Sequence, residues 1–501
     1  MAHGAGLMEK IFWKLLHCVK GLFTFTPPAP SGSVLLGYAQ DAANPTCFNR
    51  PIFWLLKQRP RHAFLVGGAG MGKSKLLEHM IAQDIALGNG FALFDPHGDL
   101  LTNTLALIGS QVQIGQEELR DRVYLLEPHA PFVLTFNPLQ VPEGMPFYPQ
   151  VLSLLDLFRR AWSEYWGPRM EEVFRACLVT LIEHRLTLAE LPLLLTEPKV
   201  RQKLVTSVRH EETRRFWQKF EELSPTMQAL YSEPILNRVH RFLSDPFLKA
   251  MLGGSEKGLD FAKLMDEGAI LLVNLPKGLL KDVQLLGSLL LNQIYWAALS
   301  RAKIPESRRK LFTVYLDEFQ TFITEESHVS DMLAECRKFK VSLVMATQCL
   351  AFLGRELRAS VLANASLQIA FRVNPQDAGL LGSEAGTGDR KMWVKRLVSL
   401  PPRHALVLMR GEGEATVMRT ADCPKVSISL ADEIRKFALS RHGRSVKEVE
   451  QVISHRHRSL LSQEQGIHGE RGDERDGKRK GKRTKFGGKK YHPSTPAKEA
   501  D

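Results

Sequence analysis

The residues best placed to do chemistry form a glycine-rich run that ends in lysine and serine. Residues 67–74 read Gly-Gly-Ala-Gly-Met-Gly-Lys-Ser and match the pattern G-x-x-x-x-G-K-[ST]. An apolar run, residues 63–66, precedes them, and a run with helical spacing, residues 75–86, follows. Backbone N–H groups of such a loop surround phosphates, and the positive end of the following helix faces them. The sequence therefore predicts a phosphate-binding loop made of Gly67, Gly68, Ala69, Gly70, Met71, Gly72, Lys73 and Ser74.

Two carboxylates further along the chain indicate that the bound nucleotide is hydrolysed. The apolar run 312–316 ends in Asp317 and Glu318. Lys73 is expected to reach the β and γ phosphates of a nucleotide, and Ser74 to share Mg²⁺ with Asp317, which would hold the metal through water. Glu318 is expected to orient or deprotonate the attacking water. No Asn/Thr-Lys-x-Asp signature of guanine recognition follows, which favours ATP as the nucleotide.

Further candidates flank a third apolar run, residues 342–346, which ends in Thr347 and Gln348. Gln348 is either a sensor of the γ phosphate on the strand beside the Asp-Glu strand or an ordinary loop residue. Arg337 and Lys338 precede this run on an expected helix. Either they lie on a solvated face, or Arg337 projects to the nucleotide of a neighbouring subunit and stabilises transition-state charge.

The elements that must position these residues are short apolar runs bounded by Gly, Pro or charged residues. Such continuous runs are typical of strands covered on both faces in a parallel α/β sheet. Between about 147 and 261 the strand pattern stops and helical spacing dominates, which predicts an all-α insertion. The expected strands span residues 63–66, 91–94, 123–126, 270–274, 312–316, 342–346, 367–371 and 405–409.

Composition fits a soluble globular chain of two or three domains. The 501 residues are 44% hydrophobic and 24% charged, with a formal net charge of +13. This charge favours polyanionic partners such as nucleic acid or anionic lipid. Residues 441–501 hold 16 basic and 9 acidic residues, and after Gly466 the sequence is of low complexity. We expect a disordered basic tail there, which is either solvated or a salt-dependent phosphate-binding arm.

The N-terminal residues 8–25 have the pattern of a basic amphipathic helix. Such a helix lies in a bilayer interface or docks on its own domain or a partner subunit. No stretch of 18 apolar residues and no signal-peptide cleavage site is present, and the six cysteines form no metal-ligand pattern. The expected location is the cytoplasm, either free or peripherally bound at the inner membrane.

Several motifs together resemble one family. The motifs are Arg61-His62, the P-loop, Asp95-Pro-His-Gly-Asp99, Trp166-Gly-Pro-Arg-Met-Glu171, Leu316-Asp-Glu-Phe-Gln320, Glu335-Cys-Arg-Lys338 and Ala346-Thr-Gln348. With these motifs, the chain over about residues 35–450 resembles the conjugative coupling ATPases of type IV secretion, the TraG/TraD-like proteins with a TraM-recognition region, within the HerA/FtsK class of DNA translocases.

The resemblance implies a RecA-like motor domain, a hexameric ring, and ATP-driven movement of DNA through its channel. The sequence of the α insertion contains no base-reading signature, so sequence-specific recognition is not predicted. The resemblance also implies that Arg61 and Arg337 lie at the subunit interface; the alternative for Arg61 is a contact with the sheet edge. Asp95 and Asp99 follow a strand that we expect beside the P-loop strand, where they would line the nucleotide pocket. A loop-capping role is the alternative for Asp99.

The resulting domain organisation is an α/β, RecA-like P-loop NTPase core with a mainly parallel sheet, interrupted by an all-α insertion. The expected boundaries are 1–30 (amphipathic segment and linker), 31–146 (core, first part), 147–262 (insertion), 263–440 (core, second part) and 441–501 (C-terminal helix and tail).

The expected function is that of a DNA-translocating ATPase acting as a coupling protein in conjugative transfer, with a relaxase or another nucleoprotein and secretion components as partners. Membrane-anchored members of the family carry N-terminal transmembrane helices, whereas this chain has only the segment 8–25. Docking to a secretion channel therefore stays open. The alternatives are a HerA-like cytosolic translocase for DNA processing or defence, and a receptor platform that uses nucleotide only to hold its ring together.

Overall fold

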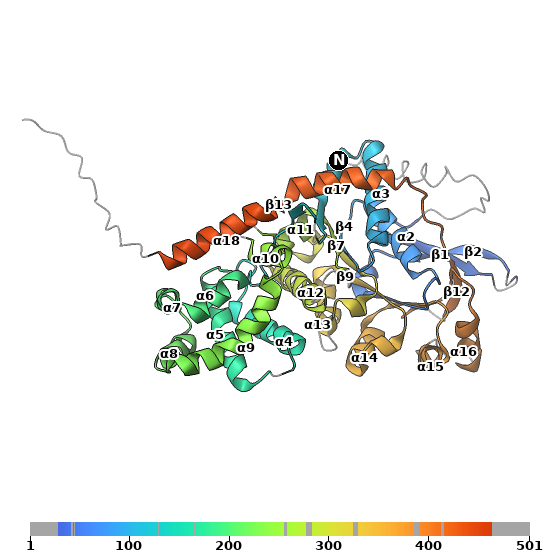
Figure 1. Ribbon diagram of the computed structural model, residues 1–501. Helices are drawn as coiled ribbons and strands as arrows, with labels where there is room; N and C mark the ends of the chain where they lie inside the picture. The colour runs from blue at the N-terminus through green and yellow to red at the C-terminus, as the bar shows by residue number, and fades with distance from the viewer. Residues whose placement is uncertain are drawn as a thin grey trace, which may run out of the picture. The chain divides into compact units, whose positions relative to one another are not determined.

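A parallel sheet of short, fully buried strands is the scaffold of the described chain (Figure 1). The computed structural model describes residues 29–41, 44, 46–128, 130–164, 166–254, 258–276, 283–323, 329–384, 390–411 and 415–462. Its parallel strands, in spatial order, are β10 (Leu367–Ala370), β3 (Ala63–Val66), β9 (Val341–Thr347), β8 (Phe312–Leu316), β4 (Gly90–Asp95), β7 (Ile270–Asn274) and β5 (Val123–Leu126). The prediction of a mainly parallel α/β sheet is confirmed.

Antiparallel strands extend the sheet beyond β10. β11 (His404–Met409), β12 (Thr416–Thr420), β1 (Val34–Gln40) and β2 (Phe48–Trp54) follow in this order, each antiparallel to its neighbour. Only β11 among them was expected from the sequence. Gly37 of β1 has to be glycine, because a Cβ there would lie 2.2 Å from the carbonyl oxygen of Arg419.

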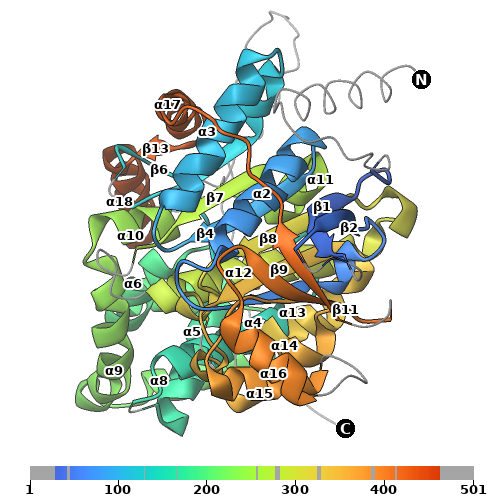
Figure 2. The same ribbon diagram turned by 90° about the vertical axis from the view of Figure 1, so that its right-hand side faces the viewer.

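The two faces of the sheet bury separate hydrophobic layers, because strand side chains point alternately to opposite faces. Leu65, Leu93 and Val344 belong to the layer under α2 (Lys73–Ala86), α3 (Asp99–Gln113) and α17 (Ser429–His442). Phe64 and Val314 belong to the other layer, which continues into α12 (Val283–Ser300), α13 (Val329–Glu335) and α14 (Arg355–Asn364). Figure 2 shows the sheet between these two sets of helices.

Between β6 (Phe132–Val133) and β7 the described chain is helical. The helices are α4 (Phe147–Ala161), α5 (Pro168–Glu183), α6 (Leu191–Thr196), α7 (Pro198–Val205), α8 (Glu211–Glu221), α9 (Pro225–Leu243), α10 (Pro246–Gly253) and α11 (Phe261–Glu267). Their core is continuous with the layer under α12 to α14. A second small helical pair, α15 (Pro375–Glu384) and α16 (Arg390–Ser399), lies between β10 and β11.

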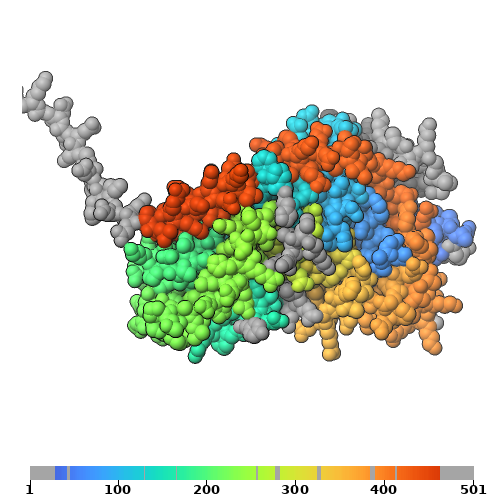
Figure 3. Space-filling view, in the orientation of Figure 1, coloured from blue at the N-terminus to red at the C-terminus, as the bar shows by residue number. Residues whose placement is uncertain are grey.

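The C-terminal helices run from the sheet to the helical insertion. α17 packs on α3 and β5, the strand β13 (Arg444–Ser445) pairs with β6, and α18 (Val446–Leu461) packs on α10 and α7. Figure 3 shows α17 and α18 in red along one side of the molecule. In the described residues no helix is long and apolar enough to span a bilayer. The amphipathic segment 8–25 and the tail after 466 lie outside the described residues.

Candidate functional site

The glycine-rich loop joins β3 to α2 at the carboxyl edge of the parallel sheet. Gly70 and Gly72 have φ values of 73° and 115°, which glycine adopts without the clash that a Cβ would cause. Lys73 is the first residue of α2 and is 5% exposed; its Nζ donates to the carbonyl oxygens of Gly67 at 2.6 Å and Gly68 at 3.2 Å. Burial lowers the pKa of Lys73, while the charges of Glu318 and Asp317 oppose that shift.

The serine of the loop contacts the first of the two predicted carboxylates. Ser74 Oγ donates a 2.8 Å hydrogen bond to Asp317 Oδ2. Asp317 is 4% exposed, and burial raises its pKa to about 6; Asp95 and Glu318 add to the rise, while Ser74 and Lys73 oppose it. A hydroxyl and a buried carboxylate at this spacing are the pair of oxygen ligands that Mg²⁺ uses beside nucleotide phosphates.

Glu318 is held by two amides. Gln320 Nε2 donates to its Oε2 at 2.6 Å, and Gln348 Nε2 donates to its Oε1 at 3.0 Å. The backbone of Glu318 has a φ of 48°, in the left-handed region that disfavours residues with a Cβ. Such conformations cluster at functional sites, where surrounding structure holds them in place. The amides therefore fix the direction of a carboxylate just past the end of β8.

Strand order explains why Gln348 meets Glu318. β9 lies between β3 and β8, so the residues that follow these three strands are adjacent at one edge. The P-loop follows β3, Gln348 follows β9, and Asp317 with Glu318 follows β8. The predicted cis residues thus come together, and Gln348 contacts the carboxylate rather than only a loop.

One sequence expectation about neighbouring strands is wrong. We expected the strand before Asp95 and Asp99 to lie beside the P-loop strand, but β4 pairs with β8 and β7. Asp95 accepts the N–H groups of His97 at 2.8 Å and Leu101 at 2.9 Å, so it orders the turn into α3, which begins at Asp99. Strand order depends on long-range pairing, which local sequence patterns do not encode.

Arg61 and Arg337 lie at the opposite edge of the sheet. Arg61 ends the 3₁₀ turn η1 (Arg59–Arg61) before β3, and Arg337 lies in the 3₁₀ turn η7 (Cys336–Phe339) before β9. Both are exposed. Because β3 and β9 are parallel, these arginines and the P-loop lie at opposite ends of the same strands. Neither arginine therefore reaches the P-loop of its own chain.

Sequence reasoning missed the residues that support the P-loop. The N–H of Gly68 donates to the carbonyl oxygen of Arg372, and the N–H of Arg403 donates to the carbonyl oxygen of Met71 at 2.8 Å. Arg403 has a φ of 66°, and its guanidinium pairs with Asp422 at 2.5 Å. The Pro401-Pro402 pair before it was the available signal, because it marks a restricted turn at the start of a strand.

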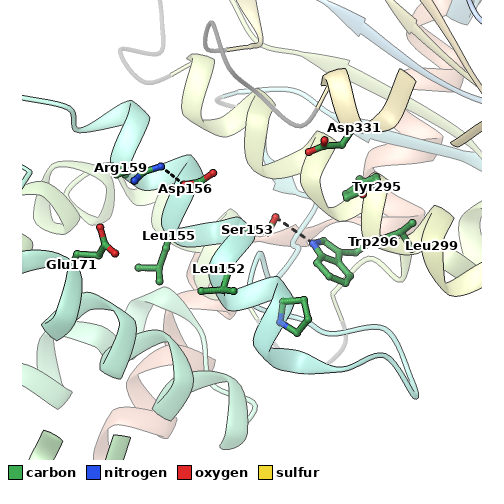
Figure 4. A pocket seen from close by; sticks show the side chains of 11 residues that line it. Leu152, Ser153, Leu155, Asp156, Arg159, Glu171, Tyr295, Trp296, Leu299 and Asp331 are labelled. Atoms are coloured by element: carbon green, nitrogen blue, oxygen red, sulfur yellow. Dashed lines mark hydrogen bonds and ion pairs between the residues drawn. The ribbon is translucent and has the colours of Figure 1, made fainter. Parts of the chain in front are cut away.

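A cavity of about 450 Å³ lies elsewhere, between the helical insertion and the core (Figure 4). Leu152, Ser153 and Asp156 of α4 face Trp296 of α12 and Asp331 of α13 across it. Trp296 Nε1 donates to Ser153 Oγ at 3.4 Å. None of the predicted site residues lines this cavity, so it is separate from the P-loop site.

The fold is similar to that of solved secretion ATPases. The conjugative plasmid coupling protein TrwB in complex with an ATP analogue is 15% identical, with a TM-score of 0.50, and the match covers 83% of this chain and 94% of TrwB. TrwB with ADP and Mg²⁺ is 17% identical at a TM-score of 0.50, over 74% of this chain and 87% of that one.

VirB4 of Thermoanaerobacter pseudethanolicus is 14% identical, with a TM-score of 0.54, over 81% of this chain and 99% of VirB4. The sequence matches no protein-family model and no curated protein. These likenesses show a RecA-like P-loop fold of the type found in type IV secretion ATPases, as the sequence resemblance implied.

Proposed function

We propose that this protein is a Mg²⁺-dependent ATPase whose P-loop site hydrolyses ATP. The observation that carries the proposal is the joint placement of Lys73, the Ser74–Asp317 pair and the amide-held Glu318 at one edge of the sheet. Bound Mg²⁺ would supply charge neutralisation at the phosphates. Ser74 and Asp317 would hold that ion, Lys73 would bind the phosphate oxygens, and Glu318 would orient the water and accept its proton.

The same proposal includes a ring of subunits. A cation that approaches the transferring phosphoryl group stabilises its transition-state charge. Arg61 and Arg337, exposed at the other edge, would meet the nucleotide site of the next subunit. A head-to-tail contact of this kind repeats around a ring when its rotation closes, and the ring proposed here is a hexamer.

We further propose that hydrolysis drives DNA movement, and that the protein acts as a coupling protein in conjugative transfer or a related secretion process. Similarity in fold to TrwB and VirB4 supports a secretion motor, and the net positive charge of +13 supports a polyanionic substrate. The helical insertion would meet incoming nucleoprotein, with the phosphate backbone rather than base edges as the contact.

Steady-state ATP hydrolysis with and without DNA tests this proposal, with the Glu318→Gln variant as the blank. Strong stimulation by DNA supports a nucleic-acid motor. ATP binding without stimulation contradicts the motor and favours the receptor platform. A HerA-like role in DNA processing or defence would also give stimulation, and it is distinguished by capture of a nuclease instead of a relaxase or secretion components.

A further inference from the structure

Two arginine-bearing turns lie side by side at the amino edge of the sheet. η1 carries Arg61 and leads into β3, while η7 carries Arg337 and leads into β9. β3 and β9 are neighbours, and η1 packs against η7. The spacing of the two guanidinium groups therefore depends on how η1 is fixed to the segment that carries η7.

A single buried side chain connects the two. His62 follows Arg61 directly and is 1% exposed. Its Nδ1 accepts a 3.0 Å hydrogen bond from the N–H of Leu343 in β9, and its Nε2 lies 3.1 Å from the carbonyl oxygen of Leu333 in α13. Helix α13 runs directly into η7. The imidazole thus joins the start of β3 both to β9 and to the helix that sets the position of Arg337.

These contacts require one tautomer of the His62 imidazole. Leu343 supplies an N–H, so Nδ1 has to be unprotonated, and Leu333 supplies a carbonyl oxygen, so Nε2 has to carry the proton. The imidazole of His62 is therefore neutral. Burial lowers the pKa of His62 to about 4, and the positive charge of Arg337 contributes to that shift, so both hydrogen bonds persist at neutral pH.

The backbone gives an independent reason to assign a role to this side chain. His62 has a φ of 63° and a ψ of 160°, a combination that is essentially restricted to glycine and strains a residue with a Cβ. Glycine would satisfy that conformation without cost but would make neither hydrogen bond. The strained, buried histidine therefore connects the segment that follows η1 to the segments on either side of η7.

The first residue of η1, Arg59, is also held in place by hydrogen bonds. Ser342 Oγ donates to the carbonyl oxygen of Arg59 at 2.5 Å, and the guanidinium of Arg59 binds both carboxylate oxygens of Asp84 in α2 at 2.6 Å. Arg59 also donates to Thr313 Oγ1 in β8 at 2.9 Å. Because η1 is anchored to α2 and β8 in this way, the hydrogen bond from His62 to α13 sets the position of Arg337 relative to Arg61.

We propose that His62 is a positioning residue that holds Arg61 and Arg337 at the spacing needed to reach the nucleotide site of a neighbouring subunit. This inference rests on the proposed function, because it assumes that the arginines act between subunits. His62 touches no reacting group, so its effect is on turnover in the assembled protein rather than on nucleotide binding to one chain.

The test is ATP hydrolysis by the full-length His62→Asn variant. Asparagine keeps the Cβ and therefore the backbone strain of histidine, and its Oδ1 replaces Nδ1 as acceptor for Leu343, but it does not reach Leu333. We expect kcat to fall about tenfold or more, with KM for ATP within about threefold of wild type, because an arginine that acts on the transition state affects kcat. His62→Gln, whose amide reaches Leu333, is expected to restore part of the loss. His455→Asn, at an exposed position on α18, is the matched control.

A double variant separates positioning from general damage. If His62 acts through Arg337, then adding His62→Asn to Arg337→Ala causes little further loss of kcat; additive losses contradict the inference. Wild-type kcat in His62→Asn overturns it directly. If His62→Asn does not fold, His62→Gly, which adopts the backbone conformation without strain, takes its place. Wild-type turnover by Arg337→Ala would instead refute the intersubunit role within the proposed function.

Discussion

Ser74 Oγ donates its hydrogen bond to Asp317 across 243 positions of sequence, and this contact joins the P-loop helix to the end of β8. It brings the two predicted Mg²⁺ ligands to a spacing of 2.8 Å, although β9 separates their strands. The three-strand group β3, β9 and β8 is therefore the unit that assembles the proposed hydrolytic site.

Replacing Glu318 with glutamine is expected to leave ATP binding intact and to lower hydrolysis about 10²–10⁴-fold, because the amide keeps the shape but loses the base. Equilibrium binding of a fluorescent ATP analogue and steady-state phosphate release measure the two effects. Glu433→Gln, an exposed carboxylate on α17, is the control and should behave as wild type. Normal turnover by Glu318→Gln would remove Glu318 from the role of base.

Mixing two inactive variants tests the contact between subunits. Arg337→Ala retains its own Glu318, and Glu318→Gln retains its own Arg337, so mixed rings contain complete sites if the arginine acts in trans. We expect ATP hydrolysis to reappear on mixing. A mixture of Lys73→Ala and Glu318→Gln should stay inactive, since both residues act within one chain. Failure of the first mixture to recover activity, although the subunits co-assemble, would argue against the ring contact.

The buried pair Arg59–Asp84 is expected to matter for stability. Both side chains are fully buried, and Tyr315 Oη also donates to Asp84 at 2.6 Å. Asp84→Ala leaves a buried guanidinium without its carboxylate, so the free energy of unfolding should fall by about 3–5 kcal/mol. The exposed pair Arg215–Glu211 is the control, and Arg215→Ala should cost less than about 1 kcal/mol. Urea denaturation followed by far-UV circular dichroism compares them.

Acid is expected to destabilise the fold through His62. Its pKa is 6.5 as a free side chain and about 4 in the folded chain, so the unfolded chain binds the proton more tightly. The free energy of unfolding should therefore decrease as pH falls from about 6.5 to 4, by about 3 kcal/mol for this residue. Denaturation midpoints between pH 4 and 8 measure the slope, which His62→Asn should reduce. An unchanged slope in that variant would contradict the assignment.

The basic tail gives a prediction from sequence alone, because residues 467–501 lie outside the described residues. If the tail binds phosphates, deleting it should weaken DNA binding mainly at low salt and reduce the dependence of affinity on salt concentration. Fluorescence anisotropy with labelled DNA at several salt concentrations measures both. An identical salt slope with and without the tail would mean that the tail is solvated.

Local patterns predicted every strand of the parallel sheet, since each is a short apolar run between turn residues. They did not predict β1, β2 and β12, which mix buried with partly or fully exposed residues and include Pro51 in β2 at the outer edge of the sheet. Such strands are defined by their pairing partners, which lie far away in the sequence. The wrong expectation that β4 lies beside β3 has the same cause, because the neighbours of β4 are also far away in the sequence.

The residues of the candidate site also fall into two groups, those with a sequence motif and those without one. The P-loop and the Asp-Glu pair have sequence signatures, so they were predictable. The contact of Gln320 with Glu318 and the support of Met71 by Arg403 have none, because both arise when separate segments meet in the folded chain. His62 was visible only as part of a motif, and its two hydrogen-bond partners depend on the packing of β9 and α13.

Helices α17 and α18 contact two different parts of the described chain. Arg435 of α17 donates to Thr102 in α3, whereas Arg456 of α18 binds Glu190 and the carbonyl oxygen of Gly253 in the helical insertion. Near the end of α18, Lys203 of α7 donates to the carbonyl oxygen of Ser459. The last turns of α18 are therefore held on the insertion and not at the nucleotide-binding edge, so α17 and α18 together link the sheet to the insertion.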